Sequence, residues 1–236
     1  MVTVTTAFPF FSSRELSVWI KMCIFESWMV TSASRPVRSA AMICRVLRNA
    51  SPVSDSQCAD TQRSGSLEAQ IDKDGGKLEY VLLTHGHYDH ICYAKQLADK
   101  YGAKIVTGRH NDVFLSDTYL NGTRAHGLPF TPFGADILLE DGEVFNLGET
   151  EITYLYTPGH TSGCGVFLFD EVMLAGDLLF CESYGRTDLP SGDDEMMLRS
   201  LKRVKELDGD YTVVPGHGPL TTLSHERRFN PLMRRL

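Results

Sequence analysis

The first 64 residues of this 236-residue chain contain no glycine, whereas the remaining 172 residues contain all 20 of them. This is a sharp change in composition. Residues 31–66 show no sustained apolar repeat of either 2 or 3.6 residues, so they predict neither a strand nor a helix. We therefore expect residues 1–65 to form an atypical N-terminal segment outside the fold, and residues 66–236 to form one folded domain.

Acidic residues are scarce near the N-terminus. Residues 1–50 carry six basic and two acidic side chains, a net charge of +4, which leaves −11 for the rest of a chain whose total is −7. Three interpretations of the N-terminal segment stay open. It is an organelle-type presequence, a poorly ordered extension, or sequence that does not belong to the fold, such as a start-site or reading-frame error upstream of about Ser66.

The chain also lacks any Cys-x-x-Cys pair, which argues against a thiolate zinc knuckle and against a dense disulfide framework. A reducing compartment is the simplest one, and we expect a cytoplasmic protein. The most apolar early segment, Val18–Val30, is interrupted by Lys21 and Glu26 and is too short to cross a bilayer. The N-terminus lacks the basic start and the cleavage pattern of a secretory signal, so we expect neither membrane insertion nor export.

The chain as a whole has fewer basic than acidic residues, and this balance limits the kind of partner that it can bind. A net charge of −7 disfavours a nucleic acid, because phosphate binding depends on clustered lysine and arginine. The apolar fraction of 42% is ordinary for a globular protein, so disorder is not indicated for the chain as a whole. We therefore expect no nucleic-acid partner, and the oligomeric state stays open.

From Leu67 onward, short apolar runs alternate with helical periods, which predicts an α/β fold with a sheet covered by helices. The expected strands are Leu78–Thr84, Lys104–Thr107, Glu151–Thr157, Val166–Phe169, Val172–Ala175 and Tyr211–Val214. The expected helices are Cys92–Lys100 and Asp193–Leu207.

The sequence THGHYDH places four ligand-type side chains directly after the apolar run that ends at Leu83. They are His85, His87, Asp89 and His90. Alternate residues of an extended segment point the same way, so His85 and His87 can bind one ion. The turn through Asp89 and His90 can then face a second ion.

Three further segments follow the same rule. TPGHTSG, LAGDLLF and VVPGHGP place His160, Asp177 and His217 after expected strands. Each lies beside a glycine, which we expect to let the backbone approach a metal closely. Five histidines and two aspartates are enough for two divalent ions, and imidazole with carboxylate suits zinc, iron or manganese. Since no thiolate is present, a purely structural zinc site is disfavoured and a catalytic one is predicted.

The His-x-His-x-Asp-His sequence, followed by single His, Asp and His residues on strand ends, resembles the metallo-β-lactamase superfamily. GRTDLPSGD and ERRFNP resemble its glyoxalase II-like small bacterial hydrolases. The resemblance implies a four-layer αββα sandwich with two metal ions, most simply zinc, at one edge of the two sheets. It assigns His85, His87 and His160 to the first metal, Asp89, His90 and His217 to the second, and Asp177 to a bridge between them.

The resemblance also implies strands that the sequence does not show. Members normally begin with two or three strands of the first sheet, and residues 1–65 give no sign of them. We therefore expect those N-terminal strands to be missing or replaced.

The implied activity is hydrolysis of a thioester of the S-lactoylglutathione type, or of a related ester, by a hydroxide held between the metals. The partner that the resemblance implies is therefore a small-molecule substrate. Asp89 would orient that hydroxide or take its proton. Arg186 and Asp188 are candidates for lining the pocket, and a salt bridge between them that fixes the loop is an equal alternative.

Three other functions stay open for the chain. They are a mononuclear iron persulfide dioxygenase using His85, His160 and Asp177; a nuclease; and a non-catalytic protein with an incomplete fold.

Overall fold

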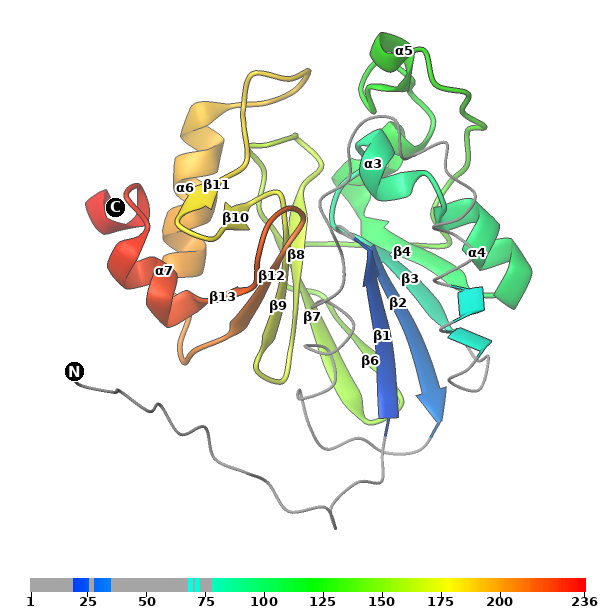
Figure 1. Cartoon of the computed structure of the whole chain (residues 1–236), viewed down its shortest axis with the longest axis horizontal. Helices are drawn as coiled ribbons and strands as arrows, with labels where there is room; N and C mark the ends of the chain where they lie inside the picture. The colour runs from blue at the N-terminus through cyan, green and yellow to red at the C-terminus, as the bar shows by residue number, and fades with distance from the viewer. Residues whose placement is uncertain (1–18, 26–27, 35–67, 70, 73–77) are drawn as a thin grey trace, which may run out of the picture.

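Two β-sheets lie face to face, and each carries helices on its outer side (Figure 1). The computed structural model describes residues 19–25, 28–34, 68–69, 71–72 and 78–236. Helices α6 and α7 cover one sheet, while α3 and α4 lie on the other. The predicted four-layer αββα sandwich is confirmed.

The first sheet has the order β1-β2-β3-β4-β5. Its strands are Trp19–Phe25, Trp28–Ser34, Tyr80–Leu83, Lys104–Gly108 and Ile137–Leu139. The pairs β1–β2 and β2–β3 are antiparallel, whereas β3–β4 and β4–β5 are parallel. The parallel pairs place the carboxyl ends of β3 and β4 at the same edge of the sheet.

The second sheet has the order β13-β12-β9-β8-β7-β6. In chain order these strands are β6 Val144–Leu147, β7 Thr150–Tyr156, β8 Gly165–Phe169, β9 Val172–Gly176, β12 Thr212–Pro215 and β13 Thr221–Thr222. A separate hairpin joins β10, Leu179–Phe180, to β11, Ser183–Tyr184. Because β12 runs parallel to β9 and β8 lies antiparallel between β7 and β9, the strands β7, β9 and β12 all end at one edge.

The helices are short except for α6. They are α3 Tyr88–Ile91, α4 Ala94–Tyr101, α5 Thr123–His126, α6 Asp194–Lys205 and α7 Leu223–Phe229, with 3₁₀ helices η3 Arg109–Leu115 and η4 Met233–Arg235. Asp193 caps α6 by accepting a hydrogen bond from the Met196 amide at 2.7 Å. Such a cap satisfies an amide that has no partner within the helix. In the part of the chain that the structure describes, no helix is both long and apolar enough to cross a membrane.

The core follows the alternation of side chains along the strands. Leu82 of β3 packs between the two sheets, together with Phe167 and Tyr154, whose ring centroids are 5.4 Å apart. Its neighbours Val81 and Leu83 point the other way, toward α4. A third cluster joins the second sheet to α6 through Met197, Leu201 and Val204. The prediction that α6 covers a sheet is therefore confirmed.

The two N-terminal strands differ from the expectation. β2 pairs with β3 in the register Trp28 to Leu83, and β1 pairs with β2, so residues 19–25 and 28–34 extend the first sheet. The expectation that residues 1–65 contribute no strand is corrected for these two stretches. The sequence hides them because Lys21 and Glu26 interrupt the apolar run, and no Asn-Gly or Asp-Gly pair separates the strands. The interpretations offered for the rest of the N-terminal segment concern residues outside those that the structure describes.

Candidate metal centre

Seven histidine and aspartate side chains meet where four strands end. His85 and His87 follow β3, His160 follows β7, Asp177 follows β9 and His217 follows β12. His87 is the N-cap of α3, and this single helical turn carries Asp89 and His90 back toward the strand ends. The sandwich thereby gathers ligand-type groups from distant parts of the chain at one edge.

One group of these side chains is formed by histidines alone. The ligand atoms of His85, His87 and His160 lie within 4.8 Å of one another, and all three residues are buried. His87 Nδ1 and His160 Nε2 are 2.8 Å apart. Three imidazoles that converge in a buried space can hold one divalent ion.

A second group combines a carboxylate with two imidazoles. Asp89 Oδ2 is 3.3 Å from both His90 Nε2 and His217 Nε2. The His217 side chain is 36% exposed and the Asp89 side chain 23% exposed, compared with 1% for His90. The second group therefore forms the side of the cluster that solvent and substrate can reach.

Asp177 lies between the two groups. Its Oδ2 is 3.4 Å from His160 Nε2 in the first group and 3.6 Å from His217 Nε2 in the second, while Oδ1 is 3.5 Å from His90 Nε2. A carboxylate in this position can contact two ions at once. The structure thus brings the seven candidate residues together at one edge of the sandwich, and their division between two ions stays a prediction.

The protonation states suit metal binding. Burial, followed by the neighbouring imidazoles His90, His160 and His87, holds the pKa of His85 well below its ordinary value. For Asp89, burial alone would raise the pKa, but His90 and hydrogen bonds from His217 and His90 outweigh it and keep the pKa well below its usual range. Neutral imidazole and ionised carboxylate are the forms that bind a metal.

The pattern of hydrogen bonds also fits a metal. His85 is fully buried, yet among the described residues its Nε2 has no hydrogen-bond partner. A buried polar atom left in this state costs about 1–3 kcal/mol. A metal ion that accepts the lone pair of His85 Nε2 would remove this cost, so the residues present fit the ions that the resemblance implies.

A backbone carbonyl orients one of the histidines. His160 Nδ1 lies 2.6 Å from the carbonyl oxygen of Arg186, to which it donates a hydrogen bond, so His160 Nε2 keeps its lone pair toward the centre. Such a bond fixes the tautomer and makes the ring a better ligand. This role of Arg186 cannot be read from a sequence, because it uses the main chain.

The side chain of Arg186 has a different partner. Its Nε and Nη2 donate to the two carboxylate oxygens of Asp188, each at 2.6 Å, and both side chains are exposed. The two candidates for lining the pocket therefore form the salt bridge that was considered as their alternative role. Only the main chain of Arg186 contacts His160, and a contact of these two side chains with substrate is a proposal.

Two of the glycines beside the ligands lie in close contact with other parts of the protein. Gly159 has φ +147°, and a Cβ there would lie 2.4 Å from Met197 Cα in α6. At Gly176, φ is +50° and a Cβ would lie 2.4 Å from Thr84 Oγ1. These two glycines let protein segments approach each other closely, whereas a Cβ at Gly218, beside His217, would meet nothing within 4 Å. The expectation that these glycines also let the backbone approach a metal stays a prediction.

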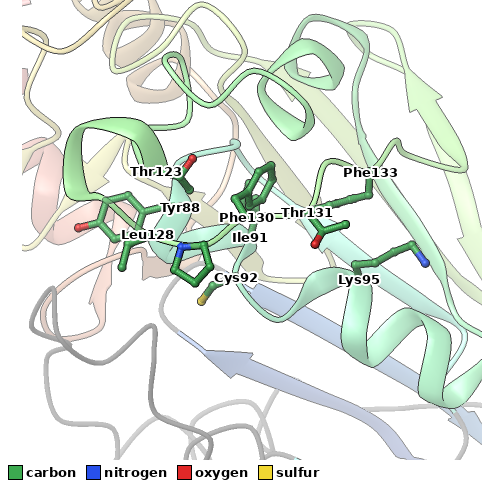
Figure 2. A pocket seen from close by; sticks show the side chains of 10 residues that line it. Tyr88, Ile91, Cys92, Lys95, Thr123, Leu128, Phe130, Thr131 and Phe133 are labelled. Atoms are coloured by element: carbon green, nitrogen blue, oxygen red, sulfur yellow. The ribbon is translucent and has the colours of Figure 1, made fainter.

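A pocket of about 240 Å³ lies beside α3, but it includes none of the seven residues. Figure 2 shows its wall between Tyr88, Ile91 and Cys92 of the α3 region and the segment around Phe130. The Tyr88 ring contacts His126, with centroids 4.5 Å apart. Tyr88 thus belongs to this pocket, while Asp89 and His90 on the same turn belong to the centre.

Comparison with known proteins agrees with this geometry. Residues 55–217 match the sequence profile of the metallo-β-lactamase superfamily. The chain belongs to this superfamily. Hydroxyacylglutathione hydrolase GloC of Haemophilus influenzae is 36% identical over 165 residues, which cover 66% of this chain and 76% of that protein. The glyoxalase II-like character predicted from the secondary motifs is thereby confirmed.

Two solved structures share the fold. The BLEG-1 B3 metallo-β-lactamase has a TM-score of 0.68 and 32% identity, covering 72% of this chain and 83% of that one. TTHA1623 in a di-iron-bound form has a TM-score of 0.63 and 33% identity, covering 71% of this chain and 84% of that one. This superfamily member is a metal-dependent hydrolase, and its cluster of histidine and aspartate side chains provides ligand groups for metal ions.

The buried histidines predict a dependence of stability on pH. Burial, and next the imidazole of His160, lowers the pKa of His87 from 6.5 to about 3. Between these values the unfolded chain binds a proton that the folded chain does not, so the free energy of unfolding falls as the pH is lowered. We expect the urea midpoint of chelator-treated protein to be lower at about pH 5 than at about pH 7.

A matched variant isolates this effect. In His87→Gln the midpoint should fall less between the two pH values, since one of the groups responsible has been removed. Equal midpoints for the parent protein at both pH values would contradict the buried, neutral state of these imidazoles.

Proposed function

We propose that this protein hydrolyses thioesters of the S-lactoylglutathione type. The observation that carries the proposal is the position of Asp177 between two ligand groups, which suits two ions held side by side. The similarity to a hydroxyacylglutathione hydrolase supports the substrate class. The leaving group also suits this reaction, because a thiolate leaves readily and needs no strong general acid.

In this proposal His85, His87 and His160 hold one ion, Asp89, His90 and His217 hold the other, and Asp177 contacts both. Zinc suits this set of imidazoles and carboxylates, and iron and manganese are the alternatives. When bound, the ions would lower the pKa of water from about 15.7 to about 7 and polarise the substrate carbonyl. The remaining roles belong to side chains of the protein.

Asp89 is the proposed catalytic residue among the seven. Its carboxylate is ionised at neutral pH, and Oδ2 faces His90 and His217 on the accessible side of the cluster. From this position it can orient the attacking water and accept its proton. Arg186, whose carbonyl oxygen accepts a hydrogen bond from His160, and its salt-bridge partner Asp188 are the proposed contacts for the polar part of the substrate.

The variant Asp89→Asn should lower kcat for thioester hydrolysis by about 10²–10⁴, the usual contribution of a general base, with a small change in KM. Steady-state kinetics on S-lactoylglutathione measures both values. Asp99→Asn is the matched control, because it makes the same chemical change at an exposed residue of α4. An unchanged kcat in Asp89→Asn would remove Asp89 from the proton transfer.

The mononuclear dioxygenase remains the competing function, because His85, His160 and Asp177 would serve it too. The gathering of Asp89, His90 and His217 into a second group favours two ions. Bound metal and oxygen consumption separate the two functions. Two ions per chain with thioester cleavage support the hydrolase, whereas one iron per chain with oxygen consumption supports the dioxygenase.

A further inference from the structure

A third group of ligand-type side chains lies outside the dinuclear centre. Cys181 and Glu182 lie in the turn of the β10–β11 hairpin, and His225 lies on α7. The thiol, carboxylate and imidazole ligand atoms are all within 4.8 Å of one another. We propose that Cys181, Glu182 and His225 form a separate, mononuclear site for a thiophilic divalent cation such as zinc.

The hairpin turn is held in a conformation that presents these side chains. Cys181 and Glu182 are the two residues between Phe180 and Ser183, which pair across the hairpin. Glu182 has φ +56°, a left-handed conformation that is uncommon for a residue other than glycine. Its amide donates a hydrogen bond to Glu226 Oε2 at 2.9 Å, which secures the turn.

Glu226 and Asn230 dock the turn onto α7. Glu226 is fully buried and accepts hydrogen bonds from Thr221 Oγ1 at 2.6 Å and from Asn230 Nδ2 at 3.0 Å. Asn230 Nδ2 also donates to the carbonyl oxygen of Ser183 at 3.0 Å. The hairpin is therefore attached to α7 on both sides of Glu182, which is why residues 43 positions apart in the chain can share one site.

His225 completes the group. Its amide donates to Thr222 Oγ1 at 3.1 Å in the N-cap of α7, and its ring contacts Phe229, with centroids 4.7 Å apart. These contacts direct Nε2 toward Glu182 Oε1, 3.1 Å away. The ligand atoms thus face one another before any ion binds, which reduces the cost of ordering them.

The charge around the thiol favours a cation over a covalent role. Burial raises the pKa of Cys181, and the carboxylates of Glu226 and Glu182 raise it further. The thiol is therefore protonated at neutral pH, unlike the thiolate of a nucleophilic Cys-His pair. A divalent ion would displace that proton and form a bond to the thiolate, as metal binding to cysteine generally does.

The ligand types select the kind of ion. A thiolate with an imidazole and one carboxylate favours zinc, whereas magnesium and calcium prefer sites made of oxygen atoms alone. Three protein ligands leave one tetrahedral position for water. The Glu182 side chain is 56% exposed and that of His225 38% exposed, so an ion can enter from solvent.

The site lies close to the dinuclear centre without sharing a residue with it. Phe180, which directly precedes Cys181, contacts the ring of His217, with centroids 6.0 Å apart. None of the three groups that contain the seven centre residues includes a cysteine. A signal from a metal–thiolate bond therefore separates the two sites.

The test is a titration of the full-length protein with Co²⁺ after its metal has been removed with a chelator, followed by absorption. We expect three equivalents to bind, and one of them to give a thiolate-to-cobalt charge-transfer band in the near ultraviolet. Cys181→Ser should abolish the band and leave two equivalents bound, and His225→Gln should weaken binding of this ion by at least about tenfold. Cys92→Ser, which removes another partly exposed thiol, should keep the band.

Circular dichroism of each variant shows whether it is folded, and none of these substitutions replaces one of the seven centre residues. A band that persists in Cys181→Ser, or the absence of any such band in the parent protein, would overturn the proposal. Neither result bears on the dinuclear hydrolase, whose ligand groups contain no cysteine.

Discussion

Asp177→Ala is expected to lose both the bridge between the two ions and the activity. Asp177 is the residue that faces both ligand groups, with Oδ2 at 3.4 Å from His160 Nε2 and 3.6 Å from His217 Nε2. Without this carboxylate, the contact that Asp177 makes with both groups of ligands is lost. We expect kcat/KM for thioester hydrolysis to fall by at least about 10²–10³, as when one group of a preorganised electrostatic centre is removed.

Metal analysis and kinetics on the same sample measure this effect. Asp208→Ala is the matched control, because Asp208 is exposed and lies outside the centre, and it should keep two ions and full activity. Retained turnover with two bound ions in Asp177→Ala would contradict the bridging role.

Gly159→Ala should combine a loss of stability with a loss of activity. A Cβ at this position would lie 2.4 Å from Met197 Cα and 2.5 Å from Met197 N, which are backbone atoms of α6 that cannot rotate away. The backbone at φ +147° is also strained for alanine. We expect the free energy of unfolding to fall by roughly 2–4 kcal/mol from overpacking and strain together.

The activity loss follows from the position of Gly159 directly before His160. Any shift that relieves the contact with α6 moves His160 relative to Asp177, and a displacement of about 1 Å can cost about a hundredfold in rate. Gly209→Ala is the control: its φ is +79°, and a Cβ there meets nothing within 4 Å. That variant should lose about 1–2 kcal/mol for the left-handed backbone alone and keep its activity. Equal effects of the two substitutions would show that the contact with α6 is unimportant.

The ligand-bearing strands were predictable because each contains apolar residues and is followed closely by a ligand-type residue. β3, β9 and β12 are mostly buried along their length, whereas β7 alternates between buried and more exposed positions at its start. The structure brings the residues after these strands to one edge. Other strands escape the same reasoning. β5 has only three residues, and β6 is exposed at alternate positions, so neither gives a clear apolar run. β1 and β2 are hidden by interrupting charges and by the absence of a glycine between them in the sequence.

The supporting parts of the centre were less predictable than the ligands. The carbonyl oxygen of Arg186 orients His160, yet a sequence shows only the side chain of that residue. The glycine beside His160 is visible in the sequence, but its reason, the backbone of α6, comes from a segment nearly 40 residues away. The group of Cys181, Glu182 and His225 depends on the docking of a hairpin turn against α7, which no local pattern reveals.

The most direct test of the proposed function is metal analysis of the purified, full-length protein, with hydrolysis of S-lactoylglutathione followed on the same sample. The dinuclear hydrolase requires at least two equivalents of zinc, iron or manganese per chain, together with thioester cleavage that a chelator abolishes and added metal restores. A single iron per chain with oxygen consumption and no thioester cleavage would contradict it, as would a folded protein that binds no metal.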